Sequence, residues 1–124
     1  MKIKLVISDD HKLFAQGLKE LITQSLPVEV VAVVFNGKEA IEACIKHKAD
    51  WVIMDINMPL INGFDTTRLI RKKGITIPII ALTAFAKDEI SDEALSSGMN
   101  DVLIKPFEPS KLILSIENLV KNKA

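Results

Sequence analysis

The sequence predicts an α/β fold in which a parallel sheet is covered by helices on both faces. Five short, continuously apolar runs alternate along the chain with longer segments whose apolar residues recur at helical spacing. Strands that are apolar on both faces must be covered on both sides, and alternation with helices supplies that cover. The length of 124 residues, with no internal repeat or linker, fits a single domain. We therefore expect one domain over residues 1–124, built from five strands and five helices.

The five apolar runs are the expected strands. The second run contains Glu29, which would be costly in a central buried strand and therefore favours an edge position. Trp51 opens the third run, and we expect it to pack at the end of that strand that is remote from the polar residues following it. The runs are Ile3–Ile7, Val28–Val34, Trp51–Met54, Ile77–Leu82 and Val102–Ile104.

Capping residues mark several of the expected helices. Asn36 with Glu39 is typical of an N-cap and capping box, and Pro109 is typical of a first helical turn. Gly98 is typical of a helix end. The segment Lys87–Ser97 offers few clear apolar contacts, so we expect this fourth helix to be the least firmly held.

Composition and charge exclude several classes of protein. The 16 Lys and Arg residues balance the 16 Asp and Glu residues, so the broad basic surface of a nucleic-acid binder is not expected. No apolar run approaches the roughly 20 residues needed to cross a bilayer, and no leader peptide precedes the first run. The single cysteine, Cys44, excludes an internal disulfide and is expected to be an inert core thiol. We expect a soluble, cytoplasmic domain that binds neither DNA nor membrane directly.

Reactive side chains follow four of the five apolar runs. Asp9 and Asp10 follow the first run, and Asp55 follows the third. Thr83 and Lys105 follow the fourth and the fifth. The ligand crevice of an open parallel sheet lies beyond the carboxyl ends of its strands. If these four strands are neighbours, three carboxylates, a hydroxyl and an ammonium group meet in one cleft.

Such a cleft has a definite chemistry. Three carboxylates within a few ångströms repel one another by several kcal/mol at an effective dielectric constant of about 20, and a hard divalent cation such as Mg²⁺ removes that repulsion. The filled cleft can accept a phosphoryl group, whose oxygens need a cation, a fixed ammonium group such as Lys105 and a donor such as Thr83. A carboxylate such as Asp55 can act as the nucleophile and form an aspartyl phosphate.

Four short motifs stand at the carboxyl ends of the expected strands. They are Asp9-Asp10, Val52–Pro59 with Gly63, Ala81–Ala84, and Lys105-Pro106-Phe107. Together they resemble the receiver domain of bacterial response regulators, and the resemblance spans essentially the whole chain. It implies a flavodoxin-like (βα)5 three-layer sandwich with a parallel five-stranded sheet of order 2-1-3-4-5.

The resemblance also implies a role for each site residue. Asp55 would accept a phosphoryl group from a phosphohistidine of a histidine kinase or phosphotransfer protein. Thr83 would hydrogen-bond that group, and Lys105 would pair with its charge. The Mg²⁺ site would comprise Asp9, Asp10, Asp55 and the backbone carbonyl of Asn57, with Asp10 favoured over Asp9 as the direct ligand.

One position departs from the pattern of the family. Receivers usually carry an aromatic residue three positions before the lysine, and here that position is Val102. Signal transmission would then depend on Thr83 and the loop before the fourth helix, with Phe85 and Phe107 as nearby apolar candidates. The output surface would be formed by the fourth helix, the fifth strand and the fifth helix, and it could support dimerisation on phosphorylation.

Several alternatives stay open at this point. A phosphohydrolase would need an acid two residues after Asp55, where Asn57 stands, and a flavin-nucleotide binder would need a glycine- and hydroxyl-rich loop after the first strand. The change at Val102 leaves room for an inactive pseudo-receiver. The run Ser8-Asp9-Asp10-His11 resembles the branch that carries a C-terminal helix-turn-helix, so the chain could be the receiver part of a longer DNA-binding regulator. His11 itself has no second His or Cys at ligand spacing, which favours a surface role.

Overall fold

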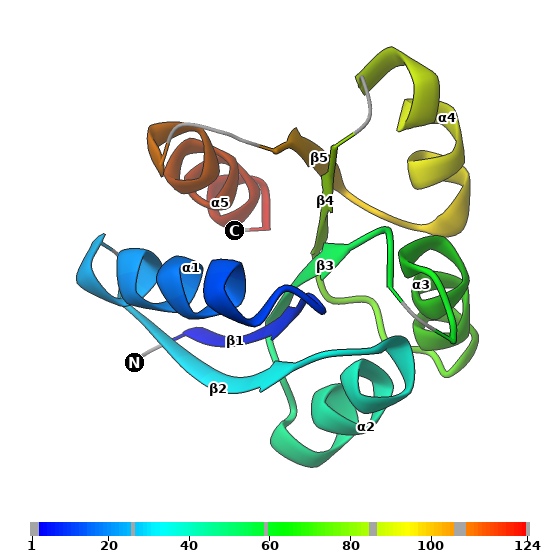
Figure 1. Ribbon diagram of the computed structural model, residues 1–124, viewed down its shortest axis with the longest axis horizontal. Helices are drawn as coiled ribbons and strands as arrows, with labels where there is room; N and C mark the ends of the chain where they lie inside the picture. The colour runs from blue at the N-terminus through cyan, green and yellow to red at the C-terminus, as the bar shows by residue number, and fades with distance from the viewer. Residues whose placement is uncertain (1–2, 26, 59, 85–86, 106–108, 124) are drawn as a thin grey trace.

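A computed structural model describes residues 3–25, 27–58, 60–84, 87–105 and 109–123 (Figure 1). Its five strands form one parallel sheet of order β2-β1-β3-β4-β5, which confirms the predicted order. The strands are β1 Ile3–Ser8, β2 Val28–Val34, β3 Trp51–Asp55, β4 Ile79–Thr83 and β5 Asp101–Ile104. The helices are α1 Lys12–Ser25, α2 Gly37–His47, α3 Gly63–Lys72, α4 Lys87–Ser97 and α5 Pro109–Lys123.

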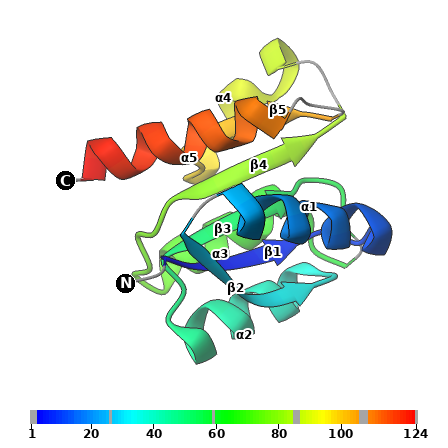
Figure 2. The same ribbon diagram turned by 90° about the vertical axis from the view of Figure 1, so that its left-hand side faces the viewer.

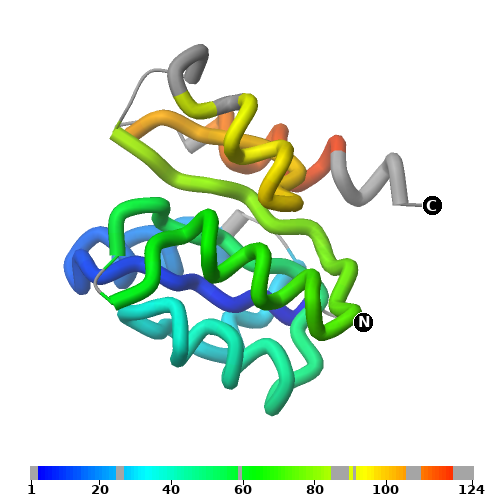
Figure 3. Tube along the Cα trace, turned by 90° about the vertical axis from the view of Figure 1, so that its right-hand side faces the viewer, coloured from blue at the N-terminus to red at the C-terminus, as the bar shows by residue number. Residues whose placement is uncertain are grey.

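Helices cover both faces of the sheet. Helices α1 and α5 lie in front of it in Figure 2, and α2, α3 and α4 lie against the opposite face in Figure 3. Because successive strand side chains point to opposite faces, Leu5 and Ile7 pack with α1 and α5 while Val6 packs on the other side. Two hydrophobic cores therefore hold a sheet that is apolar on both faces, as the continuous apolar runs predicted.

The strand and helix boundaries follow from particular residues. Strand β4 begins at Ile79, two residues later than the apolar run suggested, because Pro78 has no N–H to donate to a neighbouring strand. Glu29 is exposed on the edge strand β2, as predicted. Asn36 caps α2 by accepting a hydrogen bond from the backbone N–H of Glu39 at 2.9 Å.

The other predicted helix signals also lie at helix ends. Gly98, with a φ of 108°, directly follows α4, and Pro109 is the first residue of α5. Asn62 caps α3 by accepting a hydrogen bond from the N–H of Asp65 at 2.8 Å. Among the residues that the structure describes, no helix combines the length and the apolar character needed to cross a membrane.

The register of the sheet aligns the carboxyl ends of its central strands. Asp55 at the end of β3 pairs with Leu82, the residue before Thr83. Thr83 in turn pairs with Ile104, the residue before Lys105. The backbone N–H of Lys105 also donates a hydrogen bond to the carbonyl of Thr83 at 2.6 Å. The fold therefore gathers side chains from distant parts of the chain at the carboxyl ends of the strands.

Candidate functional site

Asp55 lies at the carboxyl end of β3, the central strand of the sheet. Its carboxylate is almost fully buried, with 3% of the side chain exposed. Its Oδ1 atom accepts a hydrogen bond from the backbone N–H of Asn57 at 3.2 Å. Its Oδ2 atom has no hydrogen-bond partner among the residues that the structure describes. A buried carboxylate oxygen without a partner is costly, so this position is not explained by stability.

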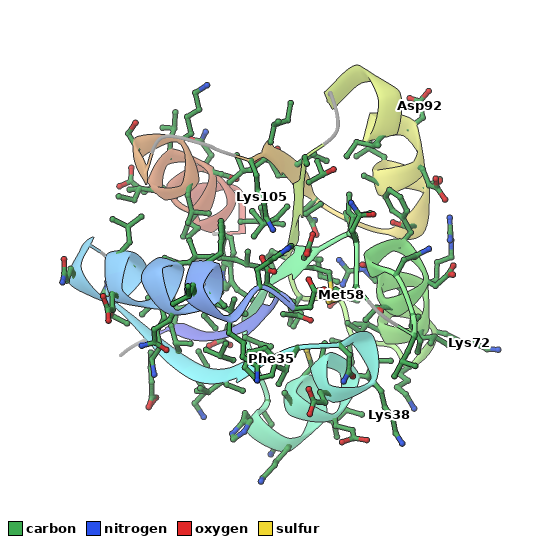
Figure 4. The ribbon with its side chains drawn as sticks, viewed as in Figure 1. Phe35, Lys38, Met58, Lys72, Asp92 and Lys105 are labelled. Atoms are coloured by element: carbon green, nitrogen blue, oxygen red, sulfur yellow. The ribbon has the colours of Figure 1, made fainter. Side chains whose placement is uncertain are left out.

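Lys105, which is labelled in Figure 4, directly follows β5 and reaches this carboxylate. Its Nζ atom lies 2.8 Å from Oδ2 of Asp9 and 3.7 Å from Oδ2 of Asp55. The same ammonium group lies 4.5 Å from the centre of the Phe14 ring, a distance that allows a cation–π interaction. Lys105 thus stands between the two buried carboxylates, with the aromatic ring as a further contact.

The acidic pair follows β1 directly. Asp9 is fully buried, and its Oδ1 atom accepts a hydrogen bond from the backbone N–H of His11 at 2.9 Å. The side chain of Asp10 is partly exposed and that of His11 is largely exposed, as the predicted surface role of the histidine requires. Even so, Asp9, Asp10, His11 and Asp55 each offer one ligand atom, and these four atoms lie within 4.8 Å of one another.

The pKa of Asp55 is raised from 3.8 to about 6, chiefly by burial and next by the nearby charge of Asp9. Lys105 and the N–H of Asn57 act in the opposite direction, and Asp10 adds a smaller upward contribution. The net effect shows that the negative charge at Asp55 is poorly compensated by the protein alone.

The residue set fits a hard divalent cation. Mg²⁺ prefers a few carboxylate and carbonyl oxygens together with water molecules, and Asp9, Asp10 and Asp55 supply such oxygens. The unpartnered Oδ2 atom of Asp55 is a position where a cation or a phosphoryl group would satisfy a buried acceptor. Asn57 is exposed two residues after Asp55, so its backbone belongs to the same loop.

The predicted switch residues divide into two groups. Thr83 is fully buried at the last position of β4, directly after Leu82, which pairs with Asp55 across the sheet. Val102 is buried in the core that faces α2, α3 and α4, as a small apolar residue on β5. Phe85 and Phe107 lie outside the described residues.

Sequence reasoning missed the contact of Phe14 with Lys105. Phe14 stands at helical spacing with Leu18 and Ile22, but spacing does not indicate which residue the ring meets. It also missed the role of Met58, whose Sδ atom accepts a hydrogen bond from Ser8 Oγ at 3.1 Å and joins the loop after β3 to the end of β1. Met58 lies near the middle of the view in Figure 4, whereas Lys72 points outward.

Gly63 has a clear steric reason in this structure. A Cβ atom there would lie 2.6 Å from the carbonyl oxygen of Asp55 and 2.8 Å from Cα of Ile56. The N–H of Gly63 donates to the carbonyl of Ile56 at 2.8 Å. The glycine in the second motif allows α3 to start directly against the backbone that carries Asp55.

The fold, the strand order and the acidic edge define a receiver domain. The chain belongs to the response regulator receiver domain family, whose sequence profile matches residues 5–117. Receiver domains of this family act as switches in two-component signalling, and they bind Mg²⁺ at an acidic pocket.

Individual relatives support this assignment. The chain is 34% identical to the chemotaxis protein CheY of Thermotoga maritima over 95% of this chain and 98% of that protein. It is 31% identical to the transcriptional regulatory protein DegU of Brevibacillus brevis over 99% of this chain but 52% of that protein. The receiver domain of the Francisella response regulator 1452 superposes with a TM-score of 0.89 at 31% identity, covering 99% of this chain and all of that domain. The chain thus spans about half the length of several curated relatives.

Proposed function

We propose that this domain accepts a phosphoryl group on Asp55 from a phosphohistidine of a histidine kinase or phosphotransfer protein, in a Mg²⁺-dependent reaction. The observation that carries the proposal is the buried Oδ2 atom of Asp55, which has no hydrogen-bond partner among the described residues and lies 3.7 Å from Lys105 Nζ. A nucleophile needs an available electron pair, and no described residue donates a hydrogen bond to this oxygen.

The chain's own residues account for most of the transfer. The Asp55 oxygen forms a bond to phosphorus as the bond from phosphorus to the donor imidazole nitrogen breaks. The imidazole keeps that electron pair, and solvent supplies its proton. Lys105 pairs with the charge on the phosphoryl oxygens, and Thr83 donates a hydrogen bond to one of them. Bound Mg²⁺ would neutralise the acidic cluster and the phosphoryl charge, held by Asp9, Asp10, Asp55 and the carbonyl of Asn57.

Phosphorylation would then change the output surface formed by α4, β5 and α5. Thr83 precedes α4 in the chain, and Lys105 stands between β5 and α5. A tighter contact of both side chains with a phosphoryl group would therefore favour one arrangement of these three elements. Coupling free energies of about 1–3 kcal/mol are typical of such switches. In this proposal Val102, a core residue of β5, moves with the output surface. Phe85 and Phe107 are further candidates for the residues that transmit the signal, and dimerisation is a candidate for the response. The domain acts as a switch and not as a turnover enzyme.

A second candidate function concerns the length of the whole protein. Several transcriptional regulatory proteins match this chain over only about half of their own length. This coverage favours the reading in which the chain is the receiver part of a longer DNA-binding regulator. In either case we expect it to work in the cytoplasm, as response regulators generally do.

The decisive experiment is incubation with acetyl phosphate and Mg²⁺, followed by intact mass measurement. The parent chain should gain one phosphoryl group, and Asp55→Asn should gain none. Asp65→Asn is the matched control, because Asp65 is exposed and pairs with Arg68 on α3. Equal labelling of the parent and Asp55→Asn would overturn the assignment of the acceptor.

A further inference from the structure

The imidazole of His11 is placed beside the acidic pair. Its Nδ1 atom lies 3.3 Å from Oδ1 of Asp9 and 3.5 Å from Oδ1 of Asp10. The backbone N–H of the same residue donates to Asp9 at 2.9 Å, which fixes where the side chain begins relative to that carboxylate. The imidazole is therefore held at the acidic cluster by its backbone as well as by its ring.

The distances within the cluster suit a shared ion. Metal–ligand bonds of about 2.1 Å place neighbouring ligand atoms about 3 Å apart and opposite ones about 4.2 Å apart. One atom each from Asp9, Asp10, His11 and Asp55 lies within 4.8 Å of the others, so shifts of a few tenths of an ångström bring all four into that range.

A second observation points to a ligand at the same place. The Asp55 carboxylate is 97% buried, and its Oδ2 atom has no hydrogen-bond partner among the described residues. Asp9 is fully buried as well and is neutralised on one oxygen by Lys105. The cluster is therefore more than a group of exposed acids, because one of its buried oxygens, Oδ2 of Asp55, accepts no hydrogen bond from the described residues and would be satisfied by a cation.

We propose that His11 is a nitrogen ligand of this site for divalent transition metals, and that it makes the site discriminate between Mn²⁺, Co²⁺ or Ni²⁺ and Mg²⁺. Magnesium takes oxygen ligands almost exclusively, whereas imidazole suits the later first-row metals. The inference rests on the metal pocket of the proposed function, but not on phosphorylation of Asp55. The alternative is that the exposed ring only hydrogen-bonds the two carboxylates. A nitrogen signal from the bound metal distinguishes a metal ligand from such a hydrogen-bond partner.

The test uses the untagged chain and the metals themselves. The chain has two histidines, so His47→Gln, at the end of α2, is the matched control for His11→Gln. Pulsed electron paramagnetic resonance of bound Mn²⁺ should show coupling to a ¹⁴N nucleus in the parent and in His47→Gln. That coupling should vanish in His11→Gln. Coupling that is absent from the parent, or that persists in His11→Gln, would overturn the proposal.

Titration calorimetry supplies the second measurement. Loss of His11 should weaken Mn²⁺ and Ni²⁺ binding by about tenfold or more, the scale seen when a metal site loses a supporting residue, and should change Mg²⁺ binding by less than about twofold. An equal loss for Mg²⁺ would show that the histidine acts on the carboxylates alone and would overturn the proposal.

Acetyl phosphate labelling keeps the two proposals distinguishable. His11→Gln should still be labelled on Asp55 with Mg²⁺. Labelling together with an absent nitrogen signal in the parent would defeat this inference alone. If the parent chain shows nitrogen coupling but is not phosphorylated with any of the metals, the proposed function is wrong. The assignment of His11 as a metal ligand then still holds.

Discussion

The two ends of the sheet treat buried charge in opposite ways. At the amino end, the guanidinium group of Arg71 donates to the carbonyls of Gly98, Ile75 and Ile77 and to Oδ1 of Asn100, at 2.7–3.0 Å. At the carboxyl end, Asp55 keeps a buried oxygen without a hydrogen bond within the described part of the chain. The hydrogen bonds of Arg71 hold loops together at the amino end, whereas the carboxyl end keeps a buried acceptor that a bound cation or phosphoryl group would satisfy.

The difference separates an end whose hydrogen bonds stabilise the fold from an end that, in the proposed function, binds the phosphoryl group. Arg71 joins the end of α3 to the turn between α4 and β5, and Asn100 in turn accepts from the backbone N–H of Ile79 at 2.9 Å. A network with matched donors and acceptors stabilises a fold. The acidic cluster instead carries repulsion that the protein only partly offsets, as the raised pKa of Asp55 shows.

The largest expected effect comes from breaking the satisfied end. Arg71→Met should lower the free energy of unfolding by about 4 kcal/mol, because several carbonyl groups lose a charged donor together. Urea denaturation at pH 7 measures this loss. Acetyl phosphate labelling of the folded fraction should persist, because the Arg71 network lies at the amino ends of the strands and Asp55 lies at a carboxyl end. Arg68→Met is the control, with a loss below about 1 kcal/mol, because the ion pairs of Arg68 with Asp65 and Glu93 are exposed to solvent. Equal losses for both variants would contradict the comparison.

The next effect comes from removing the unsatisfied charge. The pKa of Asp55 is raised in the folded state to about 6, so folding favours the protonated carboxyl group. The stability of the folded state that depends on this group is therefore full below pH 4 and is lost as the pH rises through 6. Asp55→Asn should therefore increase the free energy of unfolding at pH 7 by about 3 kcal/mol, and the gain should shrink toward pH 4. Denaturation at several pH values without Mg²⁺ measures it.

The control for this effect is Asp65→Asn, which removes an exposed carboxylate paired with Arg68 and should change the free energy of unfolding by less than about 1 kcal/mol. Added Mg²⁺ should stabilise the parent more than Asp55→Asn and so narrow the difference between them. A variant that is less stable than the parent at pH 7 would show that the buried carboxylate is compensated after all.

The smallest effect concerns the thiol of Cys44. Burial raises its pKa from 9.0 to about 11, although Arg71 acts in the opposite direction. The folded state therefore keeps the neutral thiol, and stability should fall as the pH rises from 9 through 11, by about 1 kcal/mol at pH 10. Comparing denaturation of the parent with Cys44→Ala at pH 8 and pH 10 measures this loss. A parallel loss in both proteins would assign it to other groups.

The strand ends could be predicted from sequence because their signal is local. A continuous apolar run followed by Asp55, Thr83 or Lys105 marks the position of each side chain along its strand, and parallel pairing then brings the ends together. The edge position of β2 followed from Glu29 in the same way. The cap at Asn62 was available too, because an acidic residue, Asp65, follows three positions later.

Other features could not be predicted because their partners have no side-chain signature. Arg71 binds mainly carbonyl groups, and any residue supplies a carbonyl. Nothing in the sequence around Phe14 or Met58 indicates a particular contact, and only the packing of α1 and of the loop after β3 decides what they touch. His11 was predicted to be a surface residue, and it is exposed, but sequence spacing does not show that its ring turns back toward Asp9 and Asp10.

The aromatic ring beneath Lys105 has a consequence for helix α1. The ammonium group lies 4.5 Å from the centre of the Phe14 ring, so any new anion that draws this cation toward Asp55 also changes the electric field at the ring. The first turn of α1 is thereby connected to the charge state of a strand end that lies far away in sequence. Fluorine substituted on that ring would register occupancy of the pocket without any label placed inside it.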